Sequence, residues 1–401
     1  MKIIVVGAGI GGASAGIALK RLGHEVVIYD QMQENKPVGA ALSVWSNGIK
    51  VLNWLGLAAE VAALGGRMDD MAYLDGHTGD TLCQFSLAAV TTQTGTRPYP
   101  MARADLQALL MERFGIDGIR LDMRLAGIAD DGTTVTATFA DGSTDTADML
   151  IAADGARSIA RDYVTGAAGG GPRIERTYAG YTNFNGLIPI DETIGPANQW
   201  TTYVAEGKRC SVMPIAGDRF YFFVDIPQPA GVPYDRAEGK QPLEAAFGGW
   251  APGVRALLDA IDPRVSLNRV EIWDIDPFHT WVRGRVALLG DAAHTTSPDI
   301  GQGACSALED TFALTITLAT NTISIEDSLV RYQQIRSQRA ADLVLRARKR
   351  CQETHAFDPA ATRAWYDQLR TEDGTNIIRG IVGNIIDSPI NLGGNDGRHS
   401  V

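Results

Sequence analysis

Three glycines near the start of the chain have the spacing of a phosphate-binding turn. Gly7, Gly9 and Gly12 form a G-x-G-x-x-G motif directly after the apolar residues 3–6. In such a turn the first glycine permits the bend, the second lets the backbone approach a pyrophosphate, and the third lets helix and strand pack closely. The helix expected over residues 13–22 points its free N–H groups and positive dipole end at the phosphates. The motif predicts a dinucleotide site.

An acidic residue follows at the end of the next expected strand. The apolar stretch 25–29 ends in Asp30. A carboxylate there can accept hydrogen bonds from both hydroxyls of an adenosine ribose. An ordinary βαβ unit with a glycine-rich loop is the alternative, but strand, turn, helix, strand and acid in this order favour the dinucleotide site.

Two later strands are also expected to end in an acidic residue. Asp154 follows a hairpin whose second strand is expected to reach residue 153 after a two-residue Asp141-Gly142 turn. Asp291 follows a buried strand expected over residues 284–290. Ligands of α/β sheets bind at the carboxyl ends of the strands, so we expect both acids near one site.

Further residues around these strand ends are candidates for a flat ring or a phosphate. Gly301, Gln302 and Gly303 head a helix expected over residues 304–318, and its N-terminus can stabilise negative charge on a bound ring. Ser43 and Val44 lie in a segment of small and apolar residues that would let the backbone lie against a ring. Arg103 begins the helix expected over residues 101–110, where it is either a ligand contact or a solvated charge.

Two residues suggest other chemistry. Ser14 lies in a G-x-S-x-G sequence, but the nucleophile of a hydrolase sits on the turn directly after a strand, whereas Ser14 falls in the helix. We interpret Ser14 as a packing residue, and Gly16 as a point of close helix contact. His294 is a candidate general base, although its place just after Asp291 favours a role in shaping the loop.

The composition narrows the class of protein. The chain has 401 residues, a formal net charge of −11 and 45% hydrophobic residues, which favours a large core and argues against nucleic acid or anionic membranes as partners. The four cysteines lack metal-ligand spacing, which predicts free thiols in a reducing, cytoplasmic setting and no metal site. We expect neither a leader peptide nor a membrane span.

The pattern predicts an α/β fold with two interleaved parts. We expect a Rossmann-like cofactor domain from residues 1–72, 97–177 and 275–350, and an inserted antiparallel β-sheet domain from residues 73–96 and 178–274. Aromatic residues gather in the second region, where helical periodicity fades. Residues 351–387 are expected to be helical and residues 388–401 to form a flexible tail. Lys208, Arg209 and Tyr221 are polar candidates in the sheet, although composition alone favours structural roles for them.

Together, the glycine turn, the mid-chain Asp-Gly and the late Gly-Asp before Gly-Gln-Gly resemble the single-component FAD-dependent monooxygenases of the para-hydroxybenzoate hydroxylase type. The resemblance covers roughly residues 1–350 and implies FAD as cofactor, NADH or NADPH as electron donor and O2 as co-substrate. It implies that Gly9 and Gly12 hold the pyrophosphate, Asp30 the ribose, Arg103 the ribityl–phosphate region, Asp154 a phosphate edge and Asp291 the ribityl chain. Residues 301–303 would lie under the flavin pyrimidine.

Within that family, five segments are similar to the bacterial FAD-dependent urate hydroxylases: residues 38–48, 178–186, 206–209, 219–223 and 297–303. This similarity implies that Arg209 is the catalytic, substrate-anchoring arginine and that Tyr221 binds substrate. It further implies a C4a-hydroperoxyflavin that hydroxylates urate at C5 to give 5-hydroxyisourate. A guanidinium could pair with the edge of the anionic ring and stabilise shifting charge.

Three alternatives stay open. A hydroxylase of the same architecture could act on a phenolic acid such as salicylate or hydroxybenzoate, and Arg209 would then bind a carboxylate. A redox protein could bind FAD without oxygenating a substrate. An NAD-dependent dehydrogenase is disfavoured because it needs neither Asp291 nor the glycines at 301 and 303. The expected partner is a small anionic molecule, and the protein is expected to be a monomer or homodimer.

Overall fold

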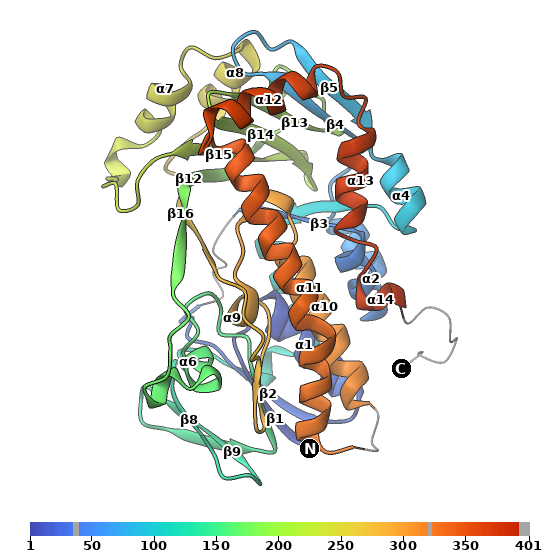
Figure 1. Ribbon diagram of the computed structural model, residues 1–401, viewed down its shortest axis with the longest axis vertical. Helices are drawn as coiled ribbons and strands as arrows, with labels where there is room; N and C mark the ends of the chain where they lie inside the picture. The colour runs from blue at the N-terminus through green and yellow to red at the C-terminus, as the bar shows by residue number, and fades with distance from the viewer. Residues whose placement is uncertain (35–39, 320–322, 393–401) are drawn as a thin grey trace.

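The computed structural model describes residues 1–34, 40–319 and 323–392 of the chain. Its parallel sheet and the helices around it form one end of the molecule, and a second, larger sheet forms the other end (Figure 1). The long helix α11, Ile325–Thr354, runs alongside both. Residues 35–39, which include the first two positions of the segment at 38–48, lie outside the described residues.

The first sheet has six strands in the order β17-β18-β11-β1-β2-β7. All neighbours pair in parallel except the edge pair of β17 and β18. Strands buried on both faces are continuous apolar runs, which explains why the central ones could be predicted from sequence. The strands are β1 Lys2–Val6, β2 Glu25–Tyr29, β7 Ile119–Arg120, β11 Met149–Ala152, β17 Val282–Arg283 and β18 Val286–Leu288.

Helix α1, Ile10–Arg21, packs against α5, Arg103–Phe114, and α10, Gly303–Leu318. Gly16 makes the close contact on the α5 side, because a Cβ there would lie 2.9 Å from ring atoms of Phe114. Ser14 is fully buried and its hydroxyl pairs with that of Thr311 on α10, at 2.9 Å. The packing interpretation of both residues is therefore confirmed.

The expected hairpin before Asp154 differs from the structure in two ways. Strand β9, Val135–Phe139, pairs with β10, Thr144–Ala147, but the chain then crosses into the first sheet as β11 instead of continuing one strand. The turn also holds three residues, 140–142, between the hydrogen-bonded pair Phe139 and Ser143. Gly142 has a φ of 86°, so its conformation fits a three-residue hairpin loop, and the two-residue prediction was wrong.

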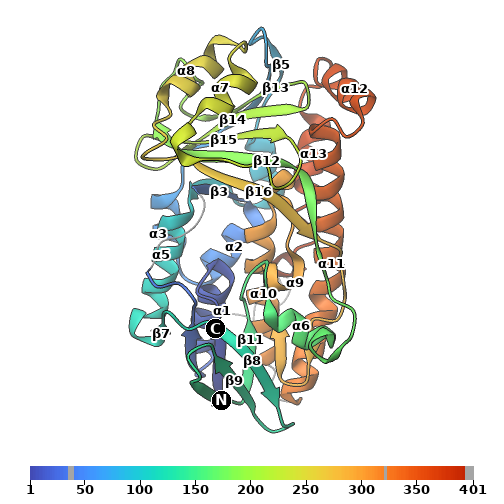
Figure 2. The same ribbon diagram turned by 90° about the vertical axis from the view of Figure 1, so that its left-hand side faces the viewer.

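The second sheet has seven strands in the order β16-β12-β15-β14-β13-β4-β5. It is antiparallel, as expected, except that β13 and β4 run parallel. Helices α7, Gln241–Phe247, and α8, Pro252–Ala260, pack on it with their own apolar cluster (Figure 2). The strands are β4 Asp70–Asp75, β5 Thr81–Ser86, β12 Arg176–Pro189, β13 Gln199–Ala205, β14 Lys208–Ile215, β15 Arg219–Pro227 and β16 Asn268–Ile275.

The C-terminal region is helical, as expected, but extends beyond residue 387. Helix α11 begins after Ser324, whose hydroxyl accepts a hydrogen bond from the Asp327 amide, with acidic residues in its first turn. It is followed by α12 Pro359–Leu369, α13 Thr375–Gly383 and α14 Pro389–Leu392. The flexible-tail prediction was wrong over residues 389–392, and residues 393–401 lie outside the described residues.

Shorter elements connect these layers. Strands β3 and β6 form a two-stranded antiparallel ribbon between the two sheets (Figure 2). No helix in the described ranges is both long and apolar enough to cross a membrane. The remaining helices and strands are α2 Ser46–Trp54, α3 Ala58–Leu64, β3 Ala41–Val44, α4 Ala88–Thr94, β6 Tyr99–Ala102, β8 Leu125–Asp130, α6 Ile159–Thr165 and α9 Asp291–His294. The 3₁₀ turn η4, Pro298–Ile300, precedes α10.

Candidate active site

A cavity of about 450 Å³ lies between the carboxyl ends of the parallel strands and the second sheet. Residues far apart in the sequence reach it because β1, β11 and β18 end at one edge, where the second sheet faces them. The predicted site residues that line it are Gly9, Gly12, Ser43, Arg103, Arg209, Tyr221, Asp291, Gly301 and Gly303. The predicted residues outside its lining are Gly7, Asp30, Val44, Asp154 and Gln302.

The glycine turn has the backbone shape that a pyrophosphate requires. Gly7 has a φ of 107°, and a Cβ on it would overlap the Ala153 carbonyl. A Cβ on Gly12 would overlap the Gly7 carbonyl oxygen, whereas one on Gly9 would meet no atom within 4 Å and would project into open space. Gly7 and Gly12 therefore permit the fold of the turn, and Gly9 leaves room for a ligand. This cradle at the start of α1 fits the diphosphate of FAD.

The Asp30 side chain binds the glycine turn and does not line the cavity. Its carboxylate accepts hydrogen bonds from the backbone N–H of Ala8, at 2.6 Å, and of Met32, at 2.7 Å. The side chain is short, so the carboxylate stays within reach of these amides at the strand end. Its contact with a ribose remains a prediction, while its contact with the glycine turn is plain from the geometry.

Asp154 also has a structural task. One carboxylate oxygen accepts from the amides of Ile159 and Ala160, at 3.0 and 3.3 Å, at the beginning of α6. Burial raises the pKa of this carboxyl group, and its other oxygen has no hydrogen-bond partner among the described residues. The neighbouring Gly155, not Asp154, lines the cavity. Asp154 thus fixes the turn that places backbone beside the ligand.

The loop before α10 brings residues 296–299, Gly301 and Gly303 to the cavity. Gly301 has a φ of 65°, and a Cβ there would lie 2.7 Å from Trp45 Nε1 and 2.8 Å from Ser43 Oγ. Gln302 points inward, where its amide oxygen accepts from Asn47 Nδ2 at 2.9 Å. Gly303 begins α10, so the helix N-terminus faces the cavity. Val44 is fully buried and does not line the cavity, whereas its neighbour Ser43 does.

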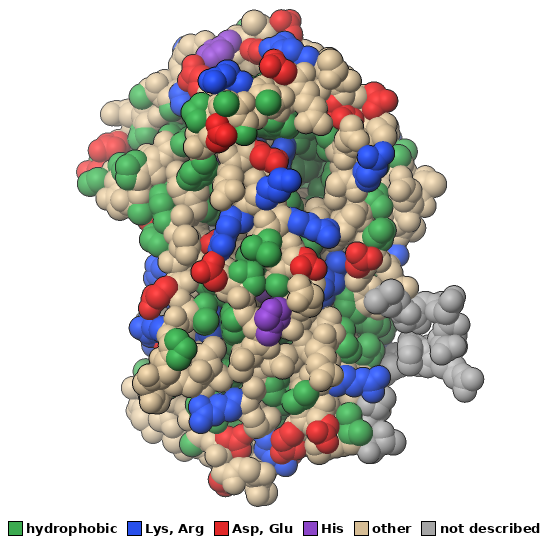
Figure 3. Space-filling model, in the orientation of Figure 1, with side chains coloured by type: hydrophobic (Ala, Val, Ile, Leu, Met, Phe, Trp, Pro, Cys, Tyr) green, Lys and Arg blue, Asp and Glu red, His purple; other side chains and the backbone are tan. Residues whose placement is uncertain are grey.

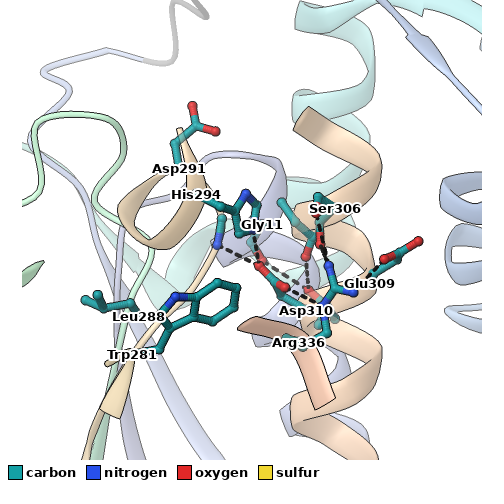
Figure 4. A network of polar contacts seen from close by, with 12 residues as sticks. Gly11, Trp281, Leu288, Asp291, His294, Ser306, Glu309, Asp310 and Arg336 are labelled. Carbon is teal, nitrogen blue, oxygen red and sulfur yellow. Dashed lines mark hydrogen bonds and ion pairs between the residues drawn. The ribbon is translucent and has the colours of Figure 1, made fainter. Parts of the chain in front are cut away.

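Behind this loop lies a buried network of charged side chains (Figure 4). His294 contacts Asp310 at 2.6 Å through Nε2, and the Gly290 amide donates to the same carboxylate oxygen at 2.9 Å. Burial raises the pKa of Asp310, but the His294 and Arg336 charges outweigh this effect and lower the pKa to about 2. His294 is buried, is directed at Asp310 and fixes the loop, while Asp291 points away from this network, is exposed and lines the cavity. The loop-shaping interpretation of His294 is confirmed.

Arg209 on β14 places a positive charge in the part of the cavity wall that the second sheet forms. Its Nε and Nη2 atoms lie 2.7 and 2.6 Å from one carboxylate oxygen of Asp225, and Nη2 lies 3.3 Å from Asp299. Both carboxylates are fully buried, and their charges raise the pKa of the guanidinium even though burial alone lowers it. The Nη1 atom has no hydrogen-bond partner among the described residues and is not sealed from solvent. Arg209 therefore keeps one free donor edge at the cavity.

The surrounding wall is aromatic and apolar. Tyr221 packs against Phe223 with ring centroids 5.5 Å apart, and the Arg209 guanidinium lies 5.1 Å from the Phe223 centroid. Trp200 and Met213 line the same side. Burial and the Asp225 charge raise the pKa of the Tyr221 phenol, so it is a neutral hydroxyl at physiological pH. The wall suits a flat ring that carries polar atoms on its edge.

Several residues of this wall have no role in the sequence-based prediction. Asp225 holds Arg209 and also accepts from Asn183 Nδ2 at 2.6 Å. Asp299 accepts from the Tyr181 hydroxyl at 3.0 Å. One signal could have revealed Asp225: a carboxylate in the apolar strand 222–226 requires a charged partner. His355 is the clearest omission, because no motif marks the region after residue 352.

Two further features lie at or near the cavity: an exposed arginine and a group of possible metal ligands. Arg103 begins α5, is exposed, lines the cavity and makes no side-chain ion pair with the described residues. Asp299, Cys351 and His355 hold ligand-type atoms within 4.8 Å of one another. Arg209 already pairs with Asp299, and a guanidinium disfavours a cation at its side. All four cysteines are free, as expected, and the structure shows that they are buried.

The chain is similar over almost its whole length to proteins of known activity. Residues 1–347 match the family model described as an FAD binding domain. The chain is 57% identical to a FAD-dependent urate hydroxylase of Mycolicibacterium vanbaalenii over 392 residues, which cover 97% of this chain and 98% of the relative. It is 47% identical to a FAD-dependent urate hydroxylase of Klebsiella pneumoniae over 390 residues, covering 97% and 100% of the two chains.

Solved structures agree with this relationship. Klebsiella pneumoniae HpxO complexed with FAD and uric acid matches with a TM-score of 0.93 at 46% identity, covering 97% of this chain and 98% of that one. A salicylate hydroxylase substrate complex matches with a TM-score of 0.75 at 22% identity, covering 96% and 98%, which shows a shared fold. The resemblance and the α/β fold class expected from the motifs are confirmed. The chain belongs to the FAD-binding family of flavoprotein monooxygenases that includes the FAD-dependent urate hydroxylases.

Proposed function

We propose that this protein hydroxylates urate at C5 to 5-hydroxyisourate, with FAD as cofactor, NADH or NADPH as electron donor and O2 as co-substrate. The observation that carries the proposal is the free edge of Arg209, held by two buried carboxylates at the wall of the cavity that the glycine turn also lines. Relatives at 57% and 47% identity that are named FAD-dependent urate hydroxylases support the choice of substrate.

The cofactor and the protein divide the work. Bound FAD would supply the redox chemistry, in which it accepts electrons from the nicotinamide donor and passes oxygen to the substrate. The backbone at Gly9 and Gly12 holds its diphosphate, and the N-terminus of α10 stabilises negative charge on its ring. We assign the ribityl–phosphate contacts to Arg103 and Asp291, whose side chains are exposed at the cavity.

Arg209 and Tyr221 orient the substrate in this proposal. The Nη1 edge donates to oxygen and nitrogen atoms on the rim of the urate anion, and its charge stabilises the negative charge as the ring reacts. Asp225 and Asp299 restrict the guanidinium to one position, so little conformational freedom is lost when substrate binds. The neutral Tyr221 hydroxyl donates a further hydrogen bond, while the aromatic wall excludes water.

The same proposal covers the organisation of the protein. The residues of the six-stranded sheet and its helices form the FAD part, and the seven-stranded sheet supplies Arg209 and Tyr221 to the substrate part. We place the protein in the cytoplasm, since four free cysteines suit a reducing compartment, and propose a monomer or homodimer.

Arg209→Lys and Tyr221→Phe test the assignment, with Lys349→Ala, an exposed change on α11, as a control. We expect FAD content to stay at the wild-type level. A lysine cannot reproduce the planar donor fork, so Arg209→Lys should lower urate turnover by about 100-fold or more. Tyr221→Phe should raise the urate KM. The assay follows NADH and O2 consumption, H2O2 and product.

The outcomes separate the alternatives. Oxidation of NADH that rises with hydroxybenzoate or salicylate but not with urate would replace the substrate by a phenolic acid. Oxidation that urate stimulates but that yields only H2O2 would make urate a mimic of the true substrate. Normal urate hydroxylation by Arg209→Lys would remove Arg209 from the chemistry.

A further inference from the structure

His355 lies at the end of α11, in a region that no motif marks, and it reaches the substrate wall. The imidazole is fully buried and stacks on Tyr181, with ring centroids 3.9 Å apart. Its Nε2 atom lies 3.5 Å from Asp299 and 4.0 Å from Asp225, the two carboxylates that hold Arg209. The C-terminal end of α11 thus contacts the Arg209 site from behind.

Both ring nitrogens of His355 face acceptors. Nδ1 lies 3.2 Å from the carbonyl oxygen of Gly207, which can only accept a hydrogen bond. Nε2 makes no hydrogen bond with the described residues, and carboxylate oxygens of Asp299 and Asp225 lie 3.5 and 4.0 Å from it. A neutral imidazole carries one proton and would leave one of these nitrogens as an acceptor opposite an acceptor. An imidazolium would present an N–H to the carbonyl on one side and positive charge to the two carboxylates on the other.

The charges around the ring suit a positive charge on the imidazole. Asp225 receives only donors, from Arg209 and Asn183. Although burial raises it, the contact with His355 and the Arg209 charge lower the pKa of Asp299 to about 2, so this carboxyl group is ionised at physiological pH. Burial keeps the Tyr181 hydroxyl and the Cys351 thiol neutral, since it raises the pKa of each. Two carboxylates and one guanidinium leave one negative charge that a protonated His355 offsets.

A tight turn connects His355 to Arg209. Glu206 and Gly207 form the two-residue hairpin turn between β13 and β14, with φ values of 53° and 71°. A Cβ on Gly207 would overlap Ala356, so only glycine lets the turn approach the helix end this closely. The Gly207 amide also donates to the Tyr366 hydroxyl at 3.1 Å. Arg209 lies two residues after Gly207, near the start of β14, so the position of the turn fixes where the strand that carries Arg209 begins.

We propose that His355 is a positioning residue of the substrate site, whose positive charge offsets Asp299 and Asp225 and leaves the free edge of Arg209 available to an anionic ring. The proposal rests on the proposed urate hydroxylation. Without the charge of His355, the cluster would carry a net negative charge beside the cavity and would repel the urate anion. The chemistry itself would remain, because FAD and Arg209 would still be present.

The test compares FAD-loaded wild type with His355→Asn and His355→Gln. Asparagine keeps a donor near the Gly207 carbonyl, and glutamine offers an uncharged donor toward Asp299. Thr354→Val is the matched control, because Thr354 is buried in the same turn but its hydroxyl donates only to the Arg350 carbonyl. We expect unchanged FAD content, a urate KM raised by about tenfold in both His355 variants, a smaller change in kcat, and no KM change in Thr354→Val.

The two His355 variants and the control separate charge from packing. Neither asparagine nor glutamine can carry the charge, so both should raise the urate KM more than kcat changes. A wild-type KM in His355→Gln would overturn the charge role. Equal KM increases in Thr354→Val and His355→Asn would show a packing effect and would also overturn it.

A second measurement stands apart from the substrate. If wild type does not hydroxylate urate, the proposed function fails, and the His355 contact is then judged by a double-mutant cycle with Asp299→Asn on the free energy of unfolding. A double variant that loses less stability than the sum of the two single losses supports the ion pair. Additive losses would overturn it.

Discussion

Arg209 shows how a single side chain depends on residues that have no motif of their own. Its position in a similar segment implied a site role, but the free Nη1 edge exists only because Asp225 and Asp299 occupy Nε and Nη2. The glycines of the first turn act differently, because the absence of a Cβ leaves room for neighbouring backbone or for a ligand. Both kinds of residue can be separated by substitution.

Gly9→Ala and Gly12→Ala should fail for different reasons. A Cβ on Gly9 meets no protein atom, so Gly9→Ala should fold with an unchanged Tm without FAD and should lose FAD affinity because the methyl group occupies ligand space. A Cβ on Gly12 overlaps the Gly7 carbonyl, so Gly12→Ala should lower the Tm of the apoprotein itself. Flavin absorbance and thermal unfolding measure the two effects.

Gly142→Ala, in the exposed hairpin loop, is the control for glycine replacement as such. It should cost about 1 kcal/mol through its positive φ and leave FAD content unchanged. Normal FAD content in Gly9→Ala would show that the diphosphate lies elsewhere.

Helices α10 and α11 share a group of buried charged side chains that do not line the cavity. Arg336 on α11 is fully buried and reaches α10, where it contacts Glu309 and Asp310 at 2.6 and 2.7 Å (Figure 4). Arg339 also contacts Glu309, at 2.7 Å. Asp310 in turn holds His294 and the Gly290 amide behind the loop that faces the ligand. The contact between two helices thereby fixes the backbone of the site.

Arg336→Met should therefore destabilise the protein strongly. It leaves Glu309 and Asp310 with fewer partners in a fully buried place, which costs about 3–5 kcal/mol in comparable cases. Urea unfolding measures the change, with Arg331→Met, an exposed position on the same helix, as control. A loss as small as that of the control would mean that the network contributes little to stability.

At the scale of the whole molecule, charge is distributed without a dominant patch on the face shown in Figure 3, where acidic and basic side chains alternate. The charges with the largest structural effect are buried at the contact between layers. Asp299 connects the loop before α10 to the second sheet through Arg209 and Tyr181. Asp310 connects α10 to α11 and α9.

These two carboxylates should make stability depend on acid pH. Their pKa is about 2 in the folded protein against an ordinary value of 3.8, so the unfolded chain takes up their protons first as the pH falls. Their stabilisation is complete well above pH 3.8 and is lost as the pH falls toward 2. Each contributes roughly 2 kcal/mol.

The free energy of unfolding measured between pH 5 and pH 2 tests this dependence. Asp310→Asn should be less stable at pH 5 and should show a shallower fall, because one of the protons taken up on unfolding is gone. Asp367→Asn, at an exposed position of α12, should behave like wild type. An unchanged slope in Asp310→Asn would contradict the assignment.

The local part of this protein follows from sequence alone. Gly7, Gly9 and Gly12 stand next to a buried apolar strand, and a short-range motif of this kind forms the same turn wherever it occurs, because its geometry depends on neighbours a few residues away. The central strands of the parallel sheet, helices α1, α5 and α10 and the segments similar to urate hydroxylases were predictable for the same reason. Asp30 and Asp154 were found as well, but their carboxylates bind backbone amides of the turn and of α6.

Only the tertiary structure decided which polar groups meet in the cavity wall. Arg209, Asp225, Asp299 and His355 come from two neighbouring strands, a loop and the end of a helix, and no spacing in the sequence relates them. Burial then makes their partnership obligatory, because a charge removed from water must find an opposite charge or a hydrogen bond. The sequence determined where a dinucleotide can bind, and the packing of the second sheet against α11 decided which side chains face the substrate.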